Sequence, residues 1–137
     1  MADLTITATS VVWTSGPKEV GVAGATITAG QAVYKDTANS DVLKLAQADG
    51  TTLESTVAGI ALNGGATNQP ISFAPTGSVI NIGATTAKTT TYMLSATAGG
   101  VCPQADLVST NKIVRLGHAT DTAGAFLVDI KVTGAVV

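Results

Sequence analysis

The segment GATITAGQAVY at residues 24–34 returns in altered form as GATTAKTTTY at residues 83–92. Three further pairs of similar segments keep the same order at an offset of 57–59 residues. They are AQADG (46–50) with PQADL (103–107), VAGIALN (57–63) with RLGHATD (115–121), and PTGSV (75–79) with VTGAV (132–136). The shared order predicts a duplicated β unit, roughly 24–81 and 83–137, whose two copies bury their apolar faces against each other. Coincidence in an Ala- and Thr-rich chain is the alternative.

Short runs with a period of two dominate the sequence, which is the pattern of half-buried strands. Gly, Asn, Asp, Thr or Pro bounds each run, and abundant Thr and Val disfavour helices. We therefore expect an all-β fold, a compact β-barrel or tulip-like sandwich, with short helical turns near 49–56 and 103–110. The expected strands are centred on residues 32–34, 57–62, 71–73, 79–82, 92–94, 113–116 and 126–132.

The two glycines inside strand-like runs are Gly59 and Gly117. A glycine in the interior of a strand usually marks a β-bulge or a close approach of another backbone. We expect one of these features at both positions.

An N-terminal arm, residues 1–17, precedes a single β domain spanning residues 18–137. The arm ends in Gly16-Pro17, a turn signal, and lies outside the duplication. Its apolar residues are the candidate interface with a neighbouring molecule: Leu4, Ile6, Val11, Val12 and Trp13. One interpretation adds this strand-like arm to a sheet edge of another chain, with Trp13 as the main contact. The other pairs the arm within its own domain, with Trp13 plugging one end of a barrel.

Composition excludes several function classes. The 137 residues suit one domain, and the formal net charge of −2 argues against electrostatic binding of nucleic acid. No apolar run approaches the length that spans a bilayer, and the first residues alternate instead of forming a secretory signal. We expect no membrane partner and synthesis in the cytoplasm.

The chain has few side chains of the types that commonly act in catalysis, with one Cys and one His. His118 has Asp121 and Thr120 nearby in sequence but no acidic cluster, so a partly exposed strand histidine is the expected role. Cys102 has no adjacent group that would stabilise a thiolate, so we expect a buried apolar side chain. The spacing of the aspartates fits no calcium loop. We therefore expect no enzyme activity, no metal site and no cofactor.

Four segments carry a resemblance to a known family. They are GATITAGQAVYKD (24–36), VAGIALNGGATNQPISF (57–73), TYMLSATAGGVCPQADL (91–107) and LGHAT (116–120). Through them the chain is similar to the small capsid cement, or decoration, proteins of tailed bacteriophages. The resemblance covers most of the chain beyond residue 23, but its patterns belong to a β body and not to a catalytic motif.

That family implies a β-barrel or tulip-like fold without catalytic activity. It also implies copies on the outer capsid surface of the virion, often trimers, which bind the major capsid protein and each other. In some members an N-terminal arm docks on the shell, which would suit residues 1–17, although that segment matches no family motif.

Two other functions stay open at the sequence level. The chain could be a phage fibre or tail-type module that recognises a host surface glycan, with Tyr34, Tyr92 or Trp13 as stacking platforms. Half-buried packing is the more ordinary role of the two tyrosines. The second function is a small hydrolase centred on His118.

Overall fold

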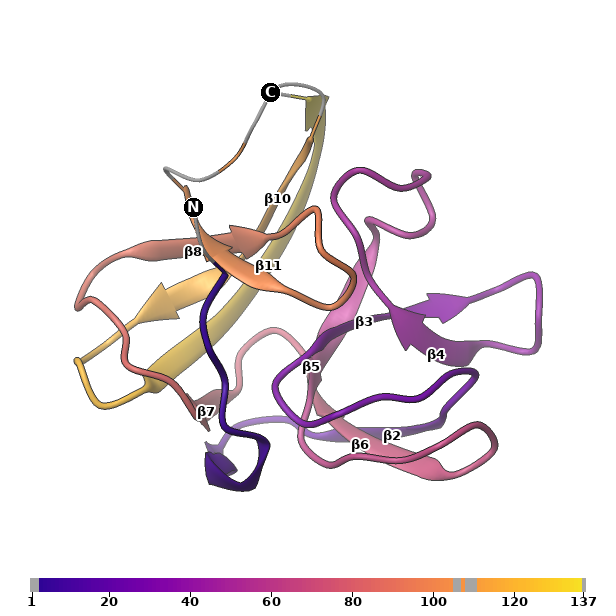
Figure 1. Ribbon diagram of the computed structural model, residues 1–137, viewed down its shortest axis with the longest axis horizontal. Helices are drawn as coiled ribbons and strands as arrows, with labels where there is room; N and C mark the ends of the chain where they lie inside the picture. The colour runs from indigo at the N-terminus through magenta and orange to yellow at the C-terminus, as the bar shows by residue number, and fades with distance from the viewer. Residues whose placement is uncertain (1–2, 105–106, 108–110, 137) are drawn as a thin grey trace.

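The computed structural model describes residues 3–104, 107 and 111–136 (Figure 1). Its strands are β1 (Val11–Ser15), β2 (Glu19–Val22), β3 (Ala32–Asp36), β4 (Val42–Leu45), β5 (Val57–Ala61), β6 (Pro70–Ala74), β7 (Val79–Ile82), β8 (Thr91–Leu94), β9 (Val101–Pro103), β10 (Lys112–Ala119) and β11 (Ala125–Val136). The 3₁₀ turn η1 (Ala8–Ser10) precedes β1. The expected all-β fold is confirmed.

The strands form two antiparallel sheets with a common topology. The five-stranded sheet has the order β2-β6-β5-β3-β4, and the six-stranded sheet has the order β1-β7-β11-β10-β8-β9. Adding five to each strand number of the five-stranded sheet gives the strand order β7-β11-β10-β8-β9 of the six-stranded sheet. The six-stranded sheet has one additional strand, β1. The repeated topology therefore starts at Glu19 and at Val79. Sequence similarity between the units is recognisable only from Gly24 and Gly83, after β2 and β7 have ended. The expected units, 24–81 and 83–137, therefore place β7 in the first unit, although it pairs in the sheet of the second.

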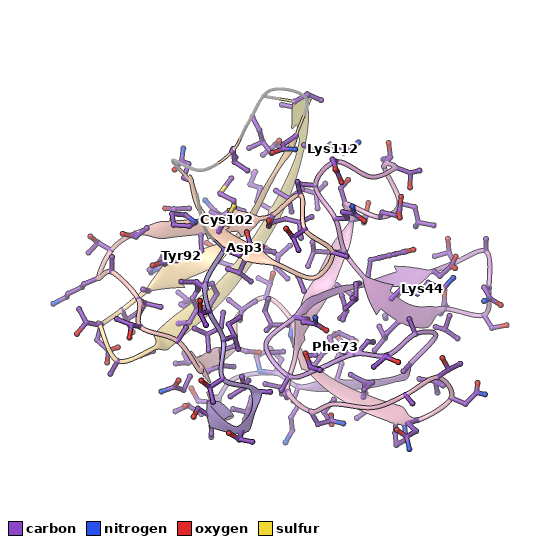
Figure 2. All side chains as sticks on the ribbon, viewed as in Figure 1. Asp3, Lys44, Phe73, Tyr92, Cys102 and Lys112 are labelled. Atoms are coloured by element: carbon purple, nitrogen blue, oxygen red, sulfur yellow. The ribbon has the colours of Figure 1, made fainter. Side chains whose placement is uncertain are left out.

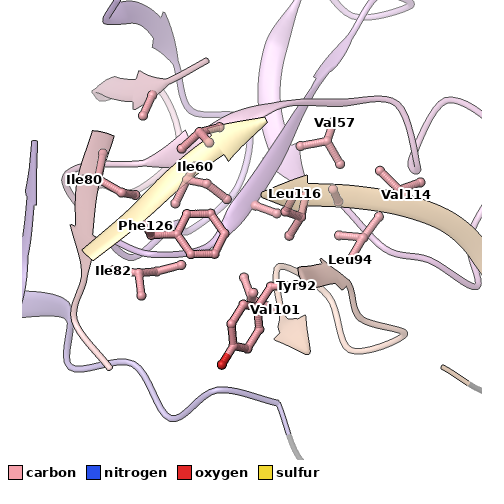
Figure 3. Close-up of a cluster of buried hydrophobic side chains, with 14 of the residues drawn as sticks. Val57, Ile60, Ile80, Ile82, Tyr92, Leu94, Val101, Val114, Leu116 and Phe126 are labelled. Carbon is pink, nitrogen blue, oxygen red and sulfur yellow. The ribbon is translucent and has the colours of Figure 1, made fainter. Parts of the chain in front are cut away.

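The main core lies between the two sheets. Phe126, Ile80 and Ile82 of the six-stranded sheet are fully buried, and Ile60 of the five-stranded sheet packs into the same cluster (Figure 3). The ring centroids of Tyr92 and Phe126 are 6.0 Å apart. Residues of both sheets bury their apolar side chains in this one cluster, so the two units share a core.

A second, smaller cluster lies on the other face of the five-stranded sheet. Phe73, Leu43 and Ile71 are buried there with Ile27 from the segment that follows β2. Ala23, just after β2, meets Leu43 of β4 at an isolated parallel bridge. The sheet thus curls around this cluster and brings its two edges together at one point.

Of the two expected architectures, a β-barrel or a tulip-like sandwich, the sandwich is confirmed, and the part of the chain described here forms no closed barrel. Its strands divide between two packed sheets, and neither sheet closes by a continuous ladder. The arrangement is a sandwich, because the large side chains of the main core separate two layers instead of filling one cylinder.

The expected helical turn near residues 49–56 is a hydrogen-bonded turn and not a helix. The Ser55 amide donates to the Thr51 carbonyl, and the Glu54 carboxylate accepts from the Thr51 amide at 2.8 Å. The other expected turn, 103–110, falls largely outside the described residues.

Bulges confirm the interpretation of the two strand glycines. Between β3 and β5 the register shifts so that Ala58 is the extra residue before Gly59. Between β8 and β10 it shifts so that Leu116 is the extra residue before Gly117. The same irregularity therefore occurs at the same point of both sheets.

Candidate interaction surfaces

Residues 3–15 form a strap along the six-stranded sheet. The Leu4 amide donates to the Val101 carbonyl of β9 at 2.7 Å, and the Thr7 amide donates to the Gly83 carbonyl at 2.8 Å. The strap then continues into β1, which pairs antiparallel with β7. The strap therefore reaches from β9, at one edge of this sheet, to β7, and its β1 segment forms the other edge.

The five predicted interface residues divide between the inside and the outside of this strap. Leu4 and Ile6 pack partly buried against the main core, and Val11 is buried. Val12 is 55% exposed and Trp13 is 37% exposed. The first three hold the strap to its own domain, and only the last two are available to another molecule. Trp13 lies at the surface and plugs no barrel.

Trp13 carries a cation over its ring. The Lys18 ammonium nitrogen lies 4.7 Å from the ring centroid. Among the described residues, Lys18 has no carboxylate within ion-pair distance. A cation–π contact at such an exposed site contributes about 0.5–1 kcal/mol and holds the indole in place.

Two neighbouring edge strands gather most of the exposed apolar side chains. Val20 and Val22 of β2 are 69% and 46% exposed, and the turn at 16–18 joins β2 to β1. We call Val12, Trp13, Val20 and Val22 the edge patch. A groove of ≈ 500 Å³ lies beside it, lined by Trp13, Lys18 and Pro70 among others. β1 ends its sheet, so no described strand pairs with its outer side.

The remaining exposed apolar side chains lie at the far end of β11. Residues 131–136 are exposed along their whole length, with Val132 and Val136 the large apolar members. A hollow of ≈ 210 Å³ lies between this end and the loop 49–56. We call it the terminal hollow; its lining includes Thr52, Ser55, Ile113, Val114, Val132 and Val136.

The candidate catalytic residues do not come together. His118 pairs across β10 with Leu127 and Thr91. The Asp121 carboxylate instead accepts from the amides of Ala123 and Ala125 at 2.8 and 3.0 Å. Asp121 therefore shapes the turn between β10 and β11.

Cys102 and the tyrosines are structural. Cys102 is buried in β9, as expected. Tyr34 and Tyr92 are 6% and 2% exposed, so neither ring is available for stacking on a ligand. The Tyr92 hydroxyl accepts a hydrogen bond from the Ala87 amide at 3.0 Å. These tyrosines are more deeply buried than the sequence suggested.

Charged side chains are dispersed over the surface, as the positions of Asp3, Lys44 and Lys112 illustrate (Figure 2). The described residues contain no group of three or more His, Cys, Asp or Glu side chains that could hold a metal ion. Nor does that part of the chain form a helix long and apolar enough to cross a membrane. The candidate functional features are therefore the edge patch and the terminal hollow.

The chain matches no model of a known protein family, and the search of curated proteins finds no significant relative.

Proposed function

We propose that this chain is a structural virion protein that binds the outer surface of a phage capsid and clamps neighbouring shell subunits, stabilising the expanded head. The observation that carries the proposal is the placement of the exposed apolar side chains. All six large ones among the described residues lie in the edge patch or at the end of β11. A clamp needs separate contact regions on one rigid body, for the shell and for neighbouring molecules.

The chemistry of these surfaces supports mechanical binding over catalysis. Apolar strand edges permit sheet-like contact with another chain without burying unpaired ions. A standard interface buries about 800 Å² per partner, and many copies on one shell add avidity. Binding only to the expanded lattice would stabilise that lattice by mass action.

The glycan-binding alternative loses two of its three stacking platforms, because Tyr34 and Tyr92 are buried. Trp13 alone, already covered on one face by Lys18, offers a poor site for a sugar ring. We therefore favour the capsid role.

Purified shells that lack this chain test the proposal. The wild-type protein should co-sediment with expanded shells and raise the temperature at which they break. Val20→Ser combined with Val22→Ser should weaken binding about tenfold or more, because both side chains lie exposed in the edge patch. Ala38→Ser, on the exposed β3–β4 loop, is the matched control and should bind normally. Absence of wild-type binding to any shell form would reject the proposal.

A further inference from the structure

Trp13 and the terminal hollow lie far apart on the molecule. In Figure 1 the indigo β1 is at the bottom of the view, and the yellow end of β11 is at the top. One chain cannot bring them together, because β1 is paired with β7 and β11 runs through the middle of the same sheet. Two copies can.

We infer that Trp13 of one copy docks into the terminal hollow of a second copy. The sizes agree, since a cavity of about 150 Å³ holds benzene and the hollow measures ≈ 210 Å³. It therefore has room for an indole ring. Its walls are largely aliphatic, with Ile113, Val114 and Val132 among them. Tryptophan, with tyrosine and arginine, is enriched in the central contacts of protein interfaces.

The polar groups of the hollow also suit an indole. The Ser55 hydroxyl donates to the Thr52 carbonyl at 3.0 Å, so its oxygen retains lone pairs that can accept. The indole nitrogen is a donor only and needs such an acceptor when it is buried. A purely aliphatic knob would leave this acceptor unused.

Charge favours the same contact. Lys18 enters with Trp13, because its ammonium group lies over the ring. The loop that forms one wall of the hollow carries Asp49 and Glu54, neither of which has an ion-pair partner among the described cations. Lys112 also lines the hollow, but its ammonium group donates to the Gly50 carbonyl. Lys112 remains a cation in that contact, so the loop 49–56 and Lys112 together carry a net charge of −1. This negative balance favours the approach of Lys18 from the other copy.

The contact is heterologous, because it joins different surfaces of two identical chains. Such contacts produce rings when the rotation closes and open chains when it does not. The inference deepens the proposed capsid role and rests on it for its biological meaning: copies would link head to tail, leaving Val20 and Val22 for the shell.

The intrinsic fluorescence of Trp13, the single tryptophan, tests the inference on the full chain without shells. Raising the concentration from micromolar to millimolar should shift its emission to shorter wavelength as sedimentation velocity detects larger species. Val132→Arg places a charge in the hollow and leaves Trp13 intact, so both changes should be lost. Val20→Ser, another exposed valine, is the matched control and should behave as wild type.

Complementation distinguishes this contact from any symmetric one. Trp13→Ala removes the knob and Val132→Arg blocks the hollow, so each variant alone should associate about 30-fold or more weakly. Their mixture should form one-to-one dimers and stop there, since one knob and one hollow remain. Circular dichroism spectra equal to wild type establish that both variants fold.

A wild-type chain that stays monomeric with unchanged emission would overturn the inference, and so would a mixture that stays monomeric. Neither result touches the capsid proposal, because shell binding is measured separately with the Val20 and Val22 variants. Failure of shell binding with intact self-association would reject the capsid role alone.

Discussion

Gly59 and Gly117 tolerate no side chain for a reason that lies in their surroundings. A Cβ atom at Gly117 would lie 2.0 Å from the Leu127 carbonyl oxygen, and one at Gly59 would lie 2.5 Å from the Ala74 carbonyl oxygen. In each case the backbone of the neighbouring strand, β11 or β6, lies too close to the glycine to leave room for a side chain. The combination of a bulge next to the glycine and a close backbone contact therefore occurs at equivalent positions of both sheets.

Gly117→Ala should lower the free energy of unfolding by about 2–3 kcal/mol or more, because backbone must move to admit the methyl group. Gly64→Ala is the control, since its nearest atom would be 3.3 Å away at an exposed position. Urea denaturation of both variants measures the difference. Equal stabilities would mean that the close approach at Gly117 is absent in solution.

Alkaline pH should destabilise the protein through two groups on neighbouring strands. Burial, together with the charges of Asp36 and Glu54, raises the pKa of Tyr34. The hydrogen bond and charge of Asp36 raise the pKa of Lys44, whose ammonium lies 2.9 Å from that carboxylate. Both groups hold their protons more tightly when folded, so their stabilisation is complete below about pH 10 and is lost above it.

Tyr34→Phe should therefore lose less stability between neutral pH and pH above about 10 than wild type does. Urea midpoints measured across that range provide the comparison. A Tyr34→Phe chain with the same alkaline loss as wild type would show that this hydroxyl does not titrate with unfolding.

At the scale of elements, the strap of residues 3–15 is held to its own domain by the apolar side chains on its inner side. Its inner side chains, Leu4 and Ile6, pack against the main core, and its β1 segment buries only Val11. The double variant Leu4→Ala, Ile6→Ala should lose about 2–4 kcal/mol of stability. Thr5→Ala, which changes the exposed residue between them, should change it by less than about 0.5 kcal/mol. A double variant as stable as Thr5→Ala would mean that the strap is detached in solution.

The sequence predicted the central strands and the strand-like arm that contains β1, but it missed the other three edge strands. The runs at 57–62 and 71–73 became β5 and β6 because these strands are buried and therefore apolar. β2, β4 and β9 were missed: each lies at or near a sheet edge, where Glu19, Lys44 and Pro103 interrupt the apolar pattern. Edge strands face solvent on one side, so periodicity predicts them poorly.

The candidate interface was predictable only in part. Alternation in the arm indicated a strand with Val12 and Trp13, but it could not tell which apolar side chains turn inward. The end of β11 was missed as a surface, because VTGAV reads as an ordinary strand. Its exposure depends on how far β11 extends beyond its neighbours, which is a property of the assembled sheet.

At the scale of the whole molecule, two sheets of common topology share one core. The duplicated order of strands is visible in the pairing, yet the units diverge at one edge: β2 approaches β4, whereas β7 pairs with β1. The main core draws on both sheets, so neither unit is expected to be stable alone.

Phe126→Ala should remove about 3–5 kcal/mol, since the ring is fully buried between the sheets. Unfolding of both wild type and variant should remain a single transition, with far-UV circular dichroism and Trp13 fluorescence changing together. Phe126→Leu, which keeps most of the buried volume, should lose clearly less. Two separated transitions would contradict a shared core.

The most direct measurement is a reconstruction by electron microscopy of expanded phage shells prepared with and without this chain. We predict additional density on the outer surface that fits the two-sheet body, with Val20 and Val22 facing the shell. Shells that bind no chain, or density placed inside the capsid, would contradict it.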